Sequence, residues 1–450
     1  MADISQADGK TVSDKIEPLA AGPRRYALGL LLVIYVLNFL DRQVVNILAE
    51  PIKLDLGLAD WQLGALTGLA FALFYTVLGL PIARLAEKAN RVSIISIAAG
   101  FWSICTVACG LAGNFVQLLI ARIGVGVGEA GCTPPAHSLI SDYTPPEKRS
   151  SAIAFYSMGI PLGSLAGMAL GGIIADSFGW RAAFFIAGAP GLILAVLAWI
   201  TLPEPRKSVK KVETTAHPTV MDAVRELASK PAFIWMSLGA AINAMVSYGH
   251  IAFYGSFYLR NHSEGLQSLA DFFNGFLGTE LGAIGFTGLA LGLLIGIFGA
   301  IGTFAGGQFA DRYVHKDARA YAAIPALAGI AGFVPFLVAM LSGSTLLSLG
   351  ALAIVTCLNS VWYGPVFASA QSLVKPRTRA TASAVILFVI NLIGLGLGPL
   401  AAGVISDIFA VQHGPAEGLR YSLVTIGVVG LLALPAFWLA SLTLRKDVEV

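Results

Sequence analysis

The chain has 450 residues, of which 56% are hydrophobic and only 12% are charged, and its net charge is +3 at pH 7. Since soluble domains carry about 25% charged residues, this composition excludes an ordinary soluble domain. The small net charge argues against a nucleic-acid partner. All four cysteines lie in apolar segments, where we expect them to pack, so neither a disulfide nor a metal site is predicted.

In chain order, the sequence shows a polar tail, six apolar segments, a polar linker and six further apolar segments. About 20 apolar residues cross a bilayer as a helix, so each segment predicts one transmembrane span. The predicted spans are 25–49, 61–84, 92–112, 115–139, 149–175, 181–202, 231–260, 281–309, 319–341, 344–373, 380–406 and 419–443. The expected fold is an all-α membrane protein with twelve transmembrane helices in two pseudo-symmetric six-helix bundles.

The expected parts of the chain are a cytoplasmic tail 1–24, a first bundle 25–203, a cytoplasmic linker 204–230, a second bundle 231–443 and a cytoplasmic tail 444–450. Most of the 29 Lys and Arg residues fall in the tails, the linker and every second loop. The positive-inside rule therefore places both termini in the cytoplasm.

On the opposite side, the loop 261–280 is unusually long for this chain. Its apolar residues recur at helical spacing, which predicts a short amphipathic helix lying at the membrane surface.

The two halves of the chain resemble each other. Residues 86–88 are matched by 310–312, and residues 171–178 by 402–409, at similar offsets along the sequence. Duplicated six-helix halves are typical of rocker-type transporters, which bind their substrate between two rigid bundles.

Four charged residues interrupt the apolar spans: Asp41, Arg42, Arg122 and Glu129. A charge in hydrocarbon costs at least about 2.5–3.5 kcal/mol, so such residues are usually paired, hydrated or functional. With a rise of about 1.5 Å per residue, Asp41 lies about 14 Å and Arg122 about 10 Å from the outer ends of their spans. We therefore expect these two to pair, with Glu129 two turns from Arg122 on the same face.

This arrangement predicts Asp41 and Glu129 as proton-coupling acids. Arg122, with Arg42, is the predicted charge switch or binding group for a substrate head group. The alternative is that Asp41 and Arg122 form a permanent structural pair. Arg42 points about 100° away from Asp41 on its helix, and we expect it to face a neighbouring helix or the outer funnel.

Polar side chains on other spans share helical faces and are candidates to line the cavity: Asn38, Asn243, Ser247, His250, Tyr254, Thr356, Asn359 and Tyr363. Hydrogen bonding between helices is the alternative role for such residues. A cavity that is charged on one wall and polar-aromatic on the other would suit an amphipathic solute with an anionic head.

The loop 83–91 after the second span resembles the loop motif of the major facilitator superfamily, with Glu87 where the family has Asp and Asn90 where it has Gly. The copy at 307–312 is closer to the pattern. The resemblance covers nearly the whole chain and implies the superfamily's fold. The predicted cytoplasmic gate residues are Glu87, Lys88, Arg91, Asp311 and Arg312. We expect Glu87 near the positive N-terminal end of a helix in the opposite half.

Two stretches, 38–42 and 122–130, are similar to the spinster branch of this superfamily. The resemblance implies a secondary active transporter that works by alternating access and exports a lysolipid-like or other amphipathic anion. The proton is the expected coupling ion, with no other cofactor. The alternative is a proton-coupled transporter of a small soluble organic anion or drug.

We expect a multi-pass monomer in the inner membrane of a bacterium, with the lipid bilayer and an amphipathic solute as its partners. An enzyme is not expected, because the six histidines are scattered and no G-x-S-x-G or H-E-x-x-H motif occurs.

Overall fold

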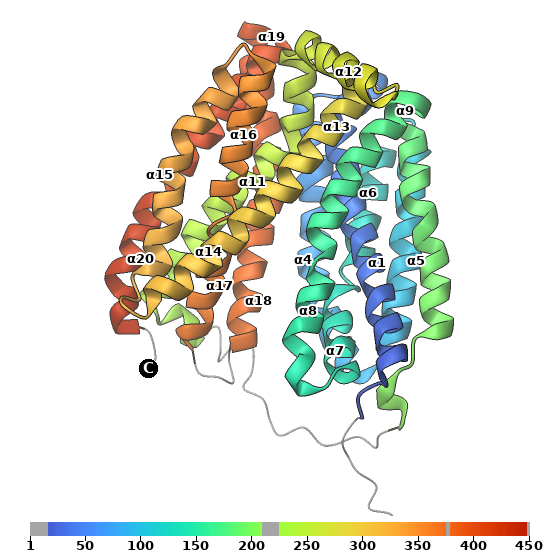
Figure 1. Cartoon of the computed structure of the whole chain (residues 1–450), viewed down its shortest axis with the longest axis vertical. Coiled ribbons are helices and arrows are strands. Elements are labelled where there is room, and N and C mark those ends of the chain that lie inside the picture. The colour runs from blue at the N-terminus through green and yellow to red at the C-terminus, as the bar shows by residue number, and fades with distance from the viewer. Residues whose placement is uncertain (1–16, 209–224, 375–378, 448–450) are drawn as a thin grey trace, which may run out of the picture.

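The computed structural model describes residues 17–208, 225–374 and 379–447 and is built of helices (Figure 1). The predicted tail 1–24, linker 204–230 and tail 444–450 therefore lie partly outside the described residues.

The helices of the first half are α1 (Ala21–Ile47), α2 (Ala49–Leu56), α3 (Asp60–Gly64), α4 (Ala70–Lys88), α5 (Arg91–Gly110), α6 (Phe115–Glu129), α7 (Thr133–Tyr143), α8 (Arg149–Ser157) and α9 (Gly159–Thr201). The π-helical segment η1 (Ala65–Leu69) joins α3 to α4, and the 3-10 segments η2 (Pro146–Lys148) and η3 (Pro205–Ser208) flank α8 and α9.

The helices of the second half are α11 (Pro231–Asn261), α12 (Ser263–Leu277), α13 (Ala283–Leu293), α14 (Gly299–Val314), α15 (Ala320–Leu341), α16 (Thr345–Asn359), α17 (Tyr363–Ser372), α18 (Arg379–Val389), α19 (Gly398–Gly430) and α20 (Ala433–Asp447). The π-helical segments η4 (Leu294–Phe298) and η5 (Ile390–Leu397) lie between α13 and α14 and between α18 and α19.

In the described part of the chain, 10 helical stretches are long and apolar enough to cross a membrane. Two of them contain a break with non-helical backbone, at Gly179 (φ 80°) and at Gly414 (φ 81°). Glycine adopts this left-handed conformation at little steric cost, so the chain can reverse there between consecutive spans. Each of these stretches therefore supplies two spans, and the predicted all-helical fold with twelve spans is confirmed.

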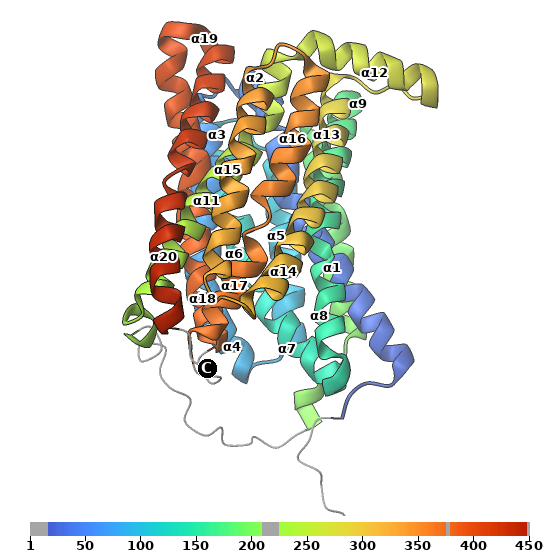
Figure 2. The same cartoon turned by 60° about the vertical axis from the view of Figure 1, so that its left-hand side comes forward.

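The helices form two bundles, one blue to green and one yellow to red in Figure 1. On the side where α12 lies, α9 packs against α13, and α3 with η1 packs against α19 and η5. We call this the α12 side, and the opposite side, where the C-terminus lies (Figures 1 and 2), the terminal side.

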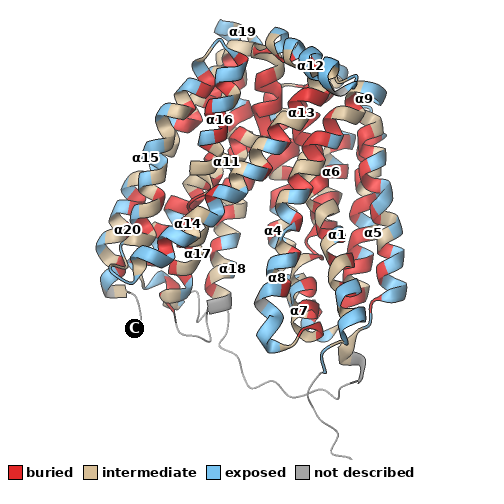
Figure 3. Ribbon diagram, in the orientation of Figure 1, coloured by how far each residue is buried: buried red, intermediate tan, exposed pale blue. Residues whose placement is uncertain are grey.

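Residues are buried where helices pack against each other, whether they are polar or apolar. Figure 3 shows buried residues on the faces where helices meet and exposed residues on the outward faces. Many outward residues are large and apolar, for example Ile104, Ile200 and Leu327. Such an outer surface is what a bilayer requires, since hydrocarbon solvates these side chains.

Candidate functional site

The deep charges of the first half form a compact cluster between α1, α4 and α6. The Nε of Arg42 donates to the Oε2 of Glu129 at 2.6 Å, and its Nη2 donates to the Oδ1 of Asn38 at 3.2 Å. The side chain of Glu129 is fully buried. Arg42 is thus the charge partner of Glu129 on α6; it does face a neighbouring helix, as expected, but this pair was not predicted.

Three aromatic rings surround the Arg42 guanidinium. Its Cζ lies 4.7 Å from the ring centre of Phe39, 4.8 Å from that of Phe71 and 4.5 Å from that of Tyr75. A cation over a ring face is stabilised by the ring's quadrupole, more strongly where water is excluded. The rings therefore help to hold the guanidinium at a depth where charge is costly.

Asp41 has a different environment from Glu129. Its Oδ2 accepts a hydrogen bond of 2.9 Å from the Thr106 hydroxyl, while its buried Oδ1 has no hydrogen-bond partner. Among the described residues, no basic side chain forms an ion pair with Asp41. The carboxyl group is 1% exposed.

The predicted pair between Asp41 and Arg122 is not formed. Arg122 donates from Nε to the carbonyl oxygen of Leu66 at 3.4 Å, and its Cζ lies 5.4 Å from the ring centre of Phe71. In the described part of the chain it forms no ion pair with an acid. Helical rise gave the two residues a common depth, but depth does not decide which way a side chain points around its helix axis.

A pocket lies between the two halves. Arg42, Arg122 and Phe71 line it from the first half, and Tyr248 and Leu395 line it from the second. The lining thus sets two bases on one wall opposite apolar and phenolic groups on the other. Tyr248 was not predicted, although it directly follows the candidate Ser247.

The polar candidates of the second half do not line this cavity. Asn243, His250 and Asn359 line a second pocket, inside the second bundle. Asn359 donates from Nδ2 to Ser247 Oγ at 2.9 Å, so the interhelical alternative holds for this pair.

The other polar candidates have local partners. Thr356 donates to the Leu352 carbonyl at 2.8 Å, the Tyr254 ring lies 5.7 Å from that of His250, and Tyr363 stacks on Trp362 at 4.0 Å. These contacts lie within the second bundle.

On the α12 side, buried ion pairs join the two halves. Arg260 at the end of α11 donates from Nε to Glu50 at 2.8 Å and from Nη1 and Nη2 to the two carboxylate oxygens of Asp60, each at 2.8 Å. Lys53 also binds Asp60, at 2.5 Å, and the Ser406 hydroxyl donates to it at 2.6 Å. Asp60 is 1% exposed. This cluster therefore closes one contact between the two halves, which we call a seam, and each of its buried charges has an oppositely charged partner.

Two aspartates cap helices of the opposite half on the same side. Asp407 of α19 accepts from the backbone N–H groups of Asp60 and Trp61 at 3.0 and 2.8 Å, at the start of α3. Asp176 of α9 accepts from the N–H of Gly285 at 2.6 Å, at the start of α13. A carboxylate at a helix N-terminus satisfies free N–H groups and favours the positive end of the helix dipole.

The two caps are the matched aspartates of the sequence repeat, so the repeat encodes a pair of equivalent contacts. Both seams also need glycine for close approach. A Cβ added to Gly403 would lie 2.2 Å from the Asp60 carbonyl oxygen, and one added to Gly288 would lie 2.3 Å from that of Met168.

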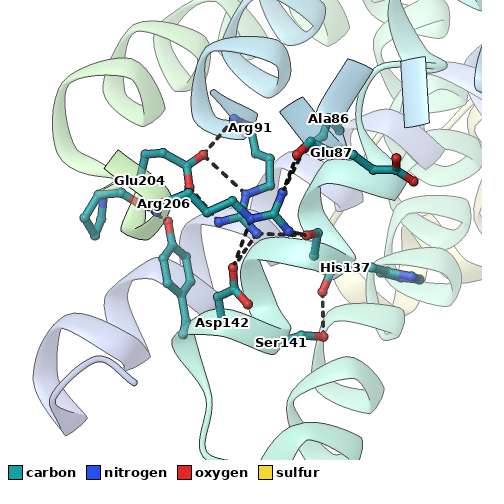
Figure 4. Close-up of polar contacts among 11 residues, drawn as sticks. Ala86, Glu87, Arg91, His137, Ser141, Asp142, Glu204 and Arg206 are labelled. Atoms are coloured by element: carbon teal, nitrogen blue, oxygen red, sulfur yellow. Dashed lines mark hydrogen bonds and ion pairs between the residues drawn. The ribbon is translucent and has the colours of Figure 1, made fainter. Parts of the chain in front are cut away.

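On the terminal side, Arg91 organises a network within the first half (Figure 4). Its Nη2 binds Glu204 at 2.6 Å, its Nη1 binds Asp142 at 2.6 Å, and its backbone N–H donates to Glu204 at 2.7 Å. Arg206 donates to the carbonyl oxygens of Ala86 and Glu87 at 3.1 and 3.2 Å. The residues that follow α9 are thus tied to the loop between α4 and α5.

The predicted gate residues form no contact between the two halves in this conformation, as far as the described residues show. Arg91 contacts only its own half, and Glu87, which we expected near a helix end of the other half, has an exposed side chain. Asp311, Arg312 and Lys88 are also exposed and form no hydrogen bond or ion pair among the described residues. The helix-end contact expected for Glu87 occurs instead on the α12 side, at Asp176 and Asp407.

Three residues with structural contacts were not predicted, and the sequence holds only a partial signal for them: Glu204, Arg206 and Arg260. Glu204 and Arg206 begin the polar linker, where composition indicates solvent rather than packing. Arg260 is one of the few bases in the loops opposite the Lys- and Arg-rich loops, but no sequence pattern connects it to Asp60. Among the described residues, no group of three His, Cys, Asp or Glu residues is arranged to hold a metal ion.

Comparison with known proteins agrees with this architecture. The family model of the major facilitator superfamily matches residues 31–399. The chain is 31% identical to an MFS-type efflux pump of Mycolicibacterium smegmatis, an alignment that covers 95% of each protein. It is 27% identical to protein spinster homolog 1 of Homo sapiens, over 96% of this chain and 83% of that one.

Among solved structures, the chain is similar to a bacterial homolog of the human lysosomal transporter spinster in an inward-facing, unoccupied conformation. The TM-score is 0.85 and the identity 33%, over 96% of this chain and 100% of that one. A point mutant of the nucleoside transporter NupG shares the fold, with a TM-score of 0.72 at 14% identity over 92% of this chain and 99% of that one. The chain therefore belongs to the major facilitator superfamily and is a membrane transporter of the spinster type.

Proposed function

We propose that this protein is a proton-coupled secondary transporter that exports a lysolipid-like or other amphipathic anion by alternating access. The observation that carries the proposal is the contrast between the two deep acids. Glu129 is paired with Arg42 at 2.6 Å, whereas buried Asp41 has only the Thr106 hydroxyl.

The environment of Asp41 supports a role in proton binding. An ionised carboxylate without a positive partner costs several kcal/mol to bury, and Asp41 forms no ion pair among the described residues, which supports Asp41 as the residue that carries the proton. Arg122 lines the wall of the central cavity and forms no ion pair with an acid among the described residues. A bound anion can therefore serve as the counter-charge of Arg122.

The lining of the cavity supports the class of solute. A guanidinium binds a carboxylate or phosphate through two parallel hydrogen bonds, while Phe71, Tyr248 and Leu395 offer apolar surface. The resemblance of the chain to the spinster branch implies a lipid-like solute.

A second candidate is export of a soluble organic anion or drug. It is favoured by the relative in Mycolicibacterium smegmatis, which is named an efflux pump. The same charges would serve both solutes, so the two candidates differ in the solute and not in the coupling step.

The orientation belongs to the proposal. The distribution of Lys and Arg residues supports a cytoplasmic location of the terminal side, in the inner membrane of a bacterium. The α12 side then faces outward and is closed by the Arg260 cluster and the two aspartate caps. The protein acts as a monomer in the bilayer, with the proton as its only coupling ion.

The test is transport of a labelled lysophospholipid in proteoliposomes, with and without a pH gradient. Asp41→Asn should reduce gradient-driven transport to the level of protein-free liposomes, because the amide cannot release a proton. Glu129→Gln should also impair transport, since it leaves Arg42 buried without its carboxylate. The matched control is Glu147→Gln, an exposed acid on the terminal side. Full pH-dependent transport by Asp41→Asn would exclude Asp41 as the coupling site, and transport of soluble anions alone would favour the second candidate.

Arg122 is tested in the same assay. Arg122→Ala should abolish transport, and Arg122→Lys should retain the charge but lose the paired hydrogen bonds, so that the apparent affinity for substrate falls. A normal rate and pH profile in Arg122→Ala would make Arg122 a structural residue.

A further inference from the structure

The helix α12 has one apolar face that is only partly covered by protein. Leu266 and Ala270, near its start, are fully buried. Further along, Phe272 and Phe276 are 70% and 79% exposed, and Phe273 is 38% exposed. On a helical projection these aromatic residues adjoin the buried residues on one side of the helix, so the apolar face continues beyond the part that the bundle covers.

The opposite face of α12 is polar. Gln267 donates to Asp271 at 2.8 Å, and Ser268 donates to the Glu264 carbonyl at 3.0 Å, all at exposed positions. In Figure 2, α12 lies across the top of the bundles and its far end projects beyond α9 and α13. The buried face points toward the bundles, and the exposed phenylalanines lie in the part of α12 that follows it along the chain.

The turn after α12 is held by side-chain hydrogen bonds. Asn274 donates from Nδ2 to the Leu281 carbonyl at 2.9 Å and accepts from the Leu281 N–H at 2.8 Å and from the Thr279 hydroxyl at 2.9 Å. The rings of Phe273 and Phe286 lie 5.5 Å apart and join α12 to α13 directly. We therefore treat α12 and the start of α13 as one rigid unit.

This unit ends at the seam between the two halves. Gly285, near the start of α13, donates its N–H to Asp176 of the first half. Any outward opening that separates α13 from α9 must break this cap and move α12 with α13. The position of α12 and the state of this seam are thus mechanically linked.

We propose that α12 is an interfacial anchor whose phenylalanine edge inserts among the lipids of the leaflet on the α12 side, and that it couples this leaflet to the α9–α13 seam. The occupant of the apolar face is bilayer lipid at the boundary of head groups and acyl chains. An amphipathic helix at that boundary buries its apolar face about 5–10 Å deep. The inference rests on membership of the transporter family and not on the identity of the solute; naming this leaflet the outer one rests on the proposed orientation.

The experiment measures the depth of spin labels in proteoliposomes of phosphatidylcholine and phosphatidylglycerol. The parent protein has its four cysteines replaced, and single labels are placed by Phe276→Cys and, as the matched control on the polar face, Asp271→Cys. The label at 276 should be accessible to oxygen and protected from a water-soluble nickel complex, with the reverse at 271. Equal nickel accessibility at both positions would overturn the proposal.

A second measurement keeps the native cysteines. Phe276→Trp should add fluorescence that brominated lipids quench and iodide does not, taken as the difference from the parent. Quenching by iodide alone would contradict the anchor. Neither measurement uses a substrate, so the result is independent of the transport tests.

The coupling to the seam has its own test. In Phe272→Ser/Phe276→Ser, hydrogen exchange at the start of α13 should become faster in liposomes, whereas Phe272→Leu/Phe276→Leu should retain the parent rate. If hydrogen exchange at the start of α13 is unchanged in the serine variant, the anchor is not coupled to the α9–α13 seam.

Discussion

The two sides of the molecule hold themselves together in different ways. On the α12 side, the polar contacts join one half to the other: Arg260 to Glu50 and Asp60, and each aspartate cap to the opposite half. On the terminal side, the ion pairs found among the described residues lie within a half, as between Arg91 and Glu204. The structure is therefore closed on the α12 side, while each bundle is braced internally on the other.

Each half has an internal brace on the terminal side. In the first half, the loop after the second span binds the end of the sixth through Arg91 and Glu204. In the second half, the loop after the eighth span binds the end of the twelfth through Asp317 and Arg445 at 2.6 Å. In the first brace the loop supplies the base and the end of the span the acid, and in the second brace the loop supplies the acid and the span the base. The first brace is buried, whereas the second is largely exposed. Rigid bundles that rock as units need such internal braces where they do not touch each other.

The largest expected effect follows from removing the charge that joins the halves. Arg260→Ala leaves Glu50 and Asp60 buried with only Lys53 nearby, and losing one partner of a buried pair costs about 3–5 kcal/mol. The closed α12 side should lose population by at least about 100-fold. Hydrogen exchange at the start of α3 measures the opening. Arg181→Ala, which removes an exposed ion pair within one half of the same side, is the control and should leave the exchange unchanged.

Glu204→Gln should destabilise the first bundle without opening the α12 side. It removes the hydrogen-bonded charge partner of a fully buried Arg91, at about 1.5–3 kcal/mol. The measurements are the thermal unfolding midpoint and the exchange at α3. If the variant opened the α12 side as Arg260→Ala does, the distinction between brace and seal would be wrong.

The pH dependence of this brace has a definite sign. Partial burial favours the neutral form of Glu204, but the hydrogen bonds from Arg91 outweigh it and hold the pKa of Glu204 below its usual value. Its contribution to stability is therefore complete above the unfolded-state pKa and is lost as the pH falls through the lower folded-state pKa. The parent protein should lose stability on acidification below about pH 4, and Glu204→Gln should lose less over that range.

The two caps should have smaller effects of similar size. Asp176→Ala and Asp407→Ala each remove a cap worth about 0.5–2 kcal/mol. Each should speed hydrogen exchange at its own seam, at Gly285 or at Asp60 and Trp61, and leave the other seam near the parent rate. The conservative variants Asp176→Asn and Asp407→Asn should retain part of the protection. If either alanine variant leaves hydrogen exchange at its own seam unchanged, the two matched aspartates do not form equivalent contacts.

The smallest effect is expected at the exposed brace of the second half. Hydrogen bonding to Arg445 lowers the pKa of Asp317 to about 2, so its contribution is lost only as the pH falls toward that value. Because solvent screens exposed pairs, the unfolding midpoint of Arg445→Ala at pH 7 should not be separable from that of the parent. A clear loss of stability there would show that the two braces are equivalent despite their different burial.

Sequence reasoning found the deep charges but assigned one partner incorrectly. Helical rise placed Asp41, Arg122 and Glu129 near one cavity, and Arg122 lines it. The pairing of Arg42 with Glu129 could not be predicted, because a long side chain reaches a partner according to the packing and rotation of two helices. Asp176 and Asp407 were visible as a repeat, yet their partners depend on close backbone contact at the seams.

By itself, the sequence determined the class of protein, the number of spans, the twofold repeat and the membership of the transporter family. These follow from the length of apolar runs, the cost of burying charge and motif spacing, which are properties of short segments. Tertiary structure alone decided which base meets which acid, that Arg91 braces the first half in this conformation, and that the α12 side is closed. The physical reason is that contacts between bundles depend on the relative rotation and packing of several helices and not on local pattern.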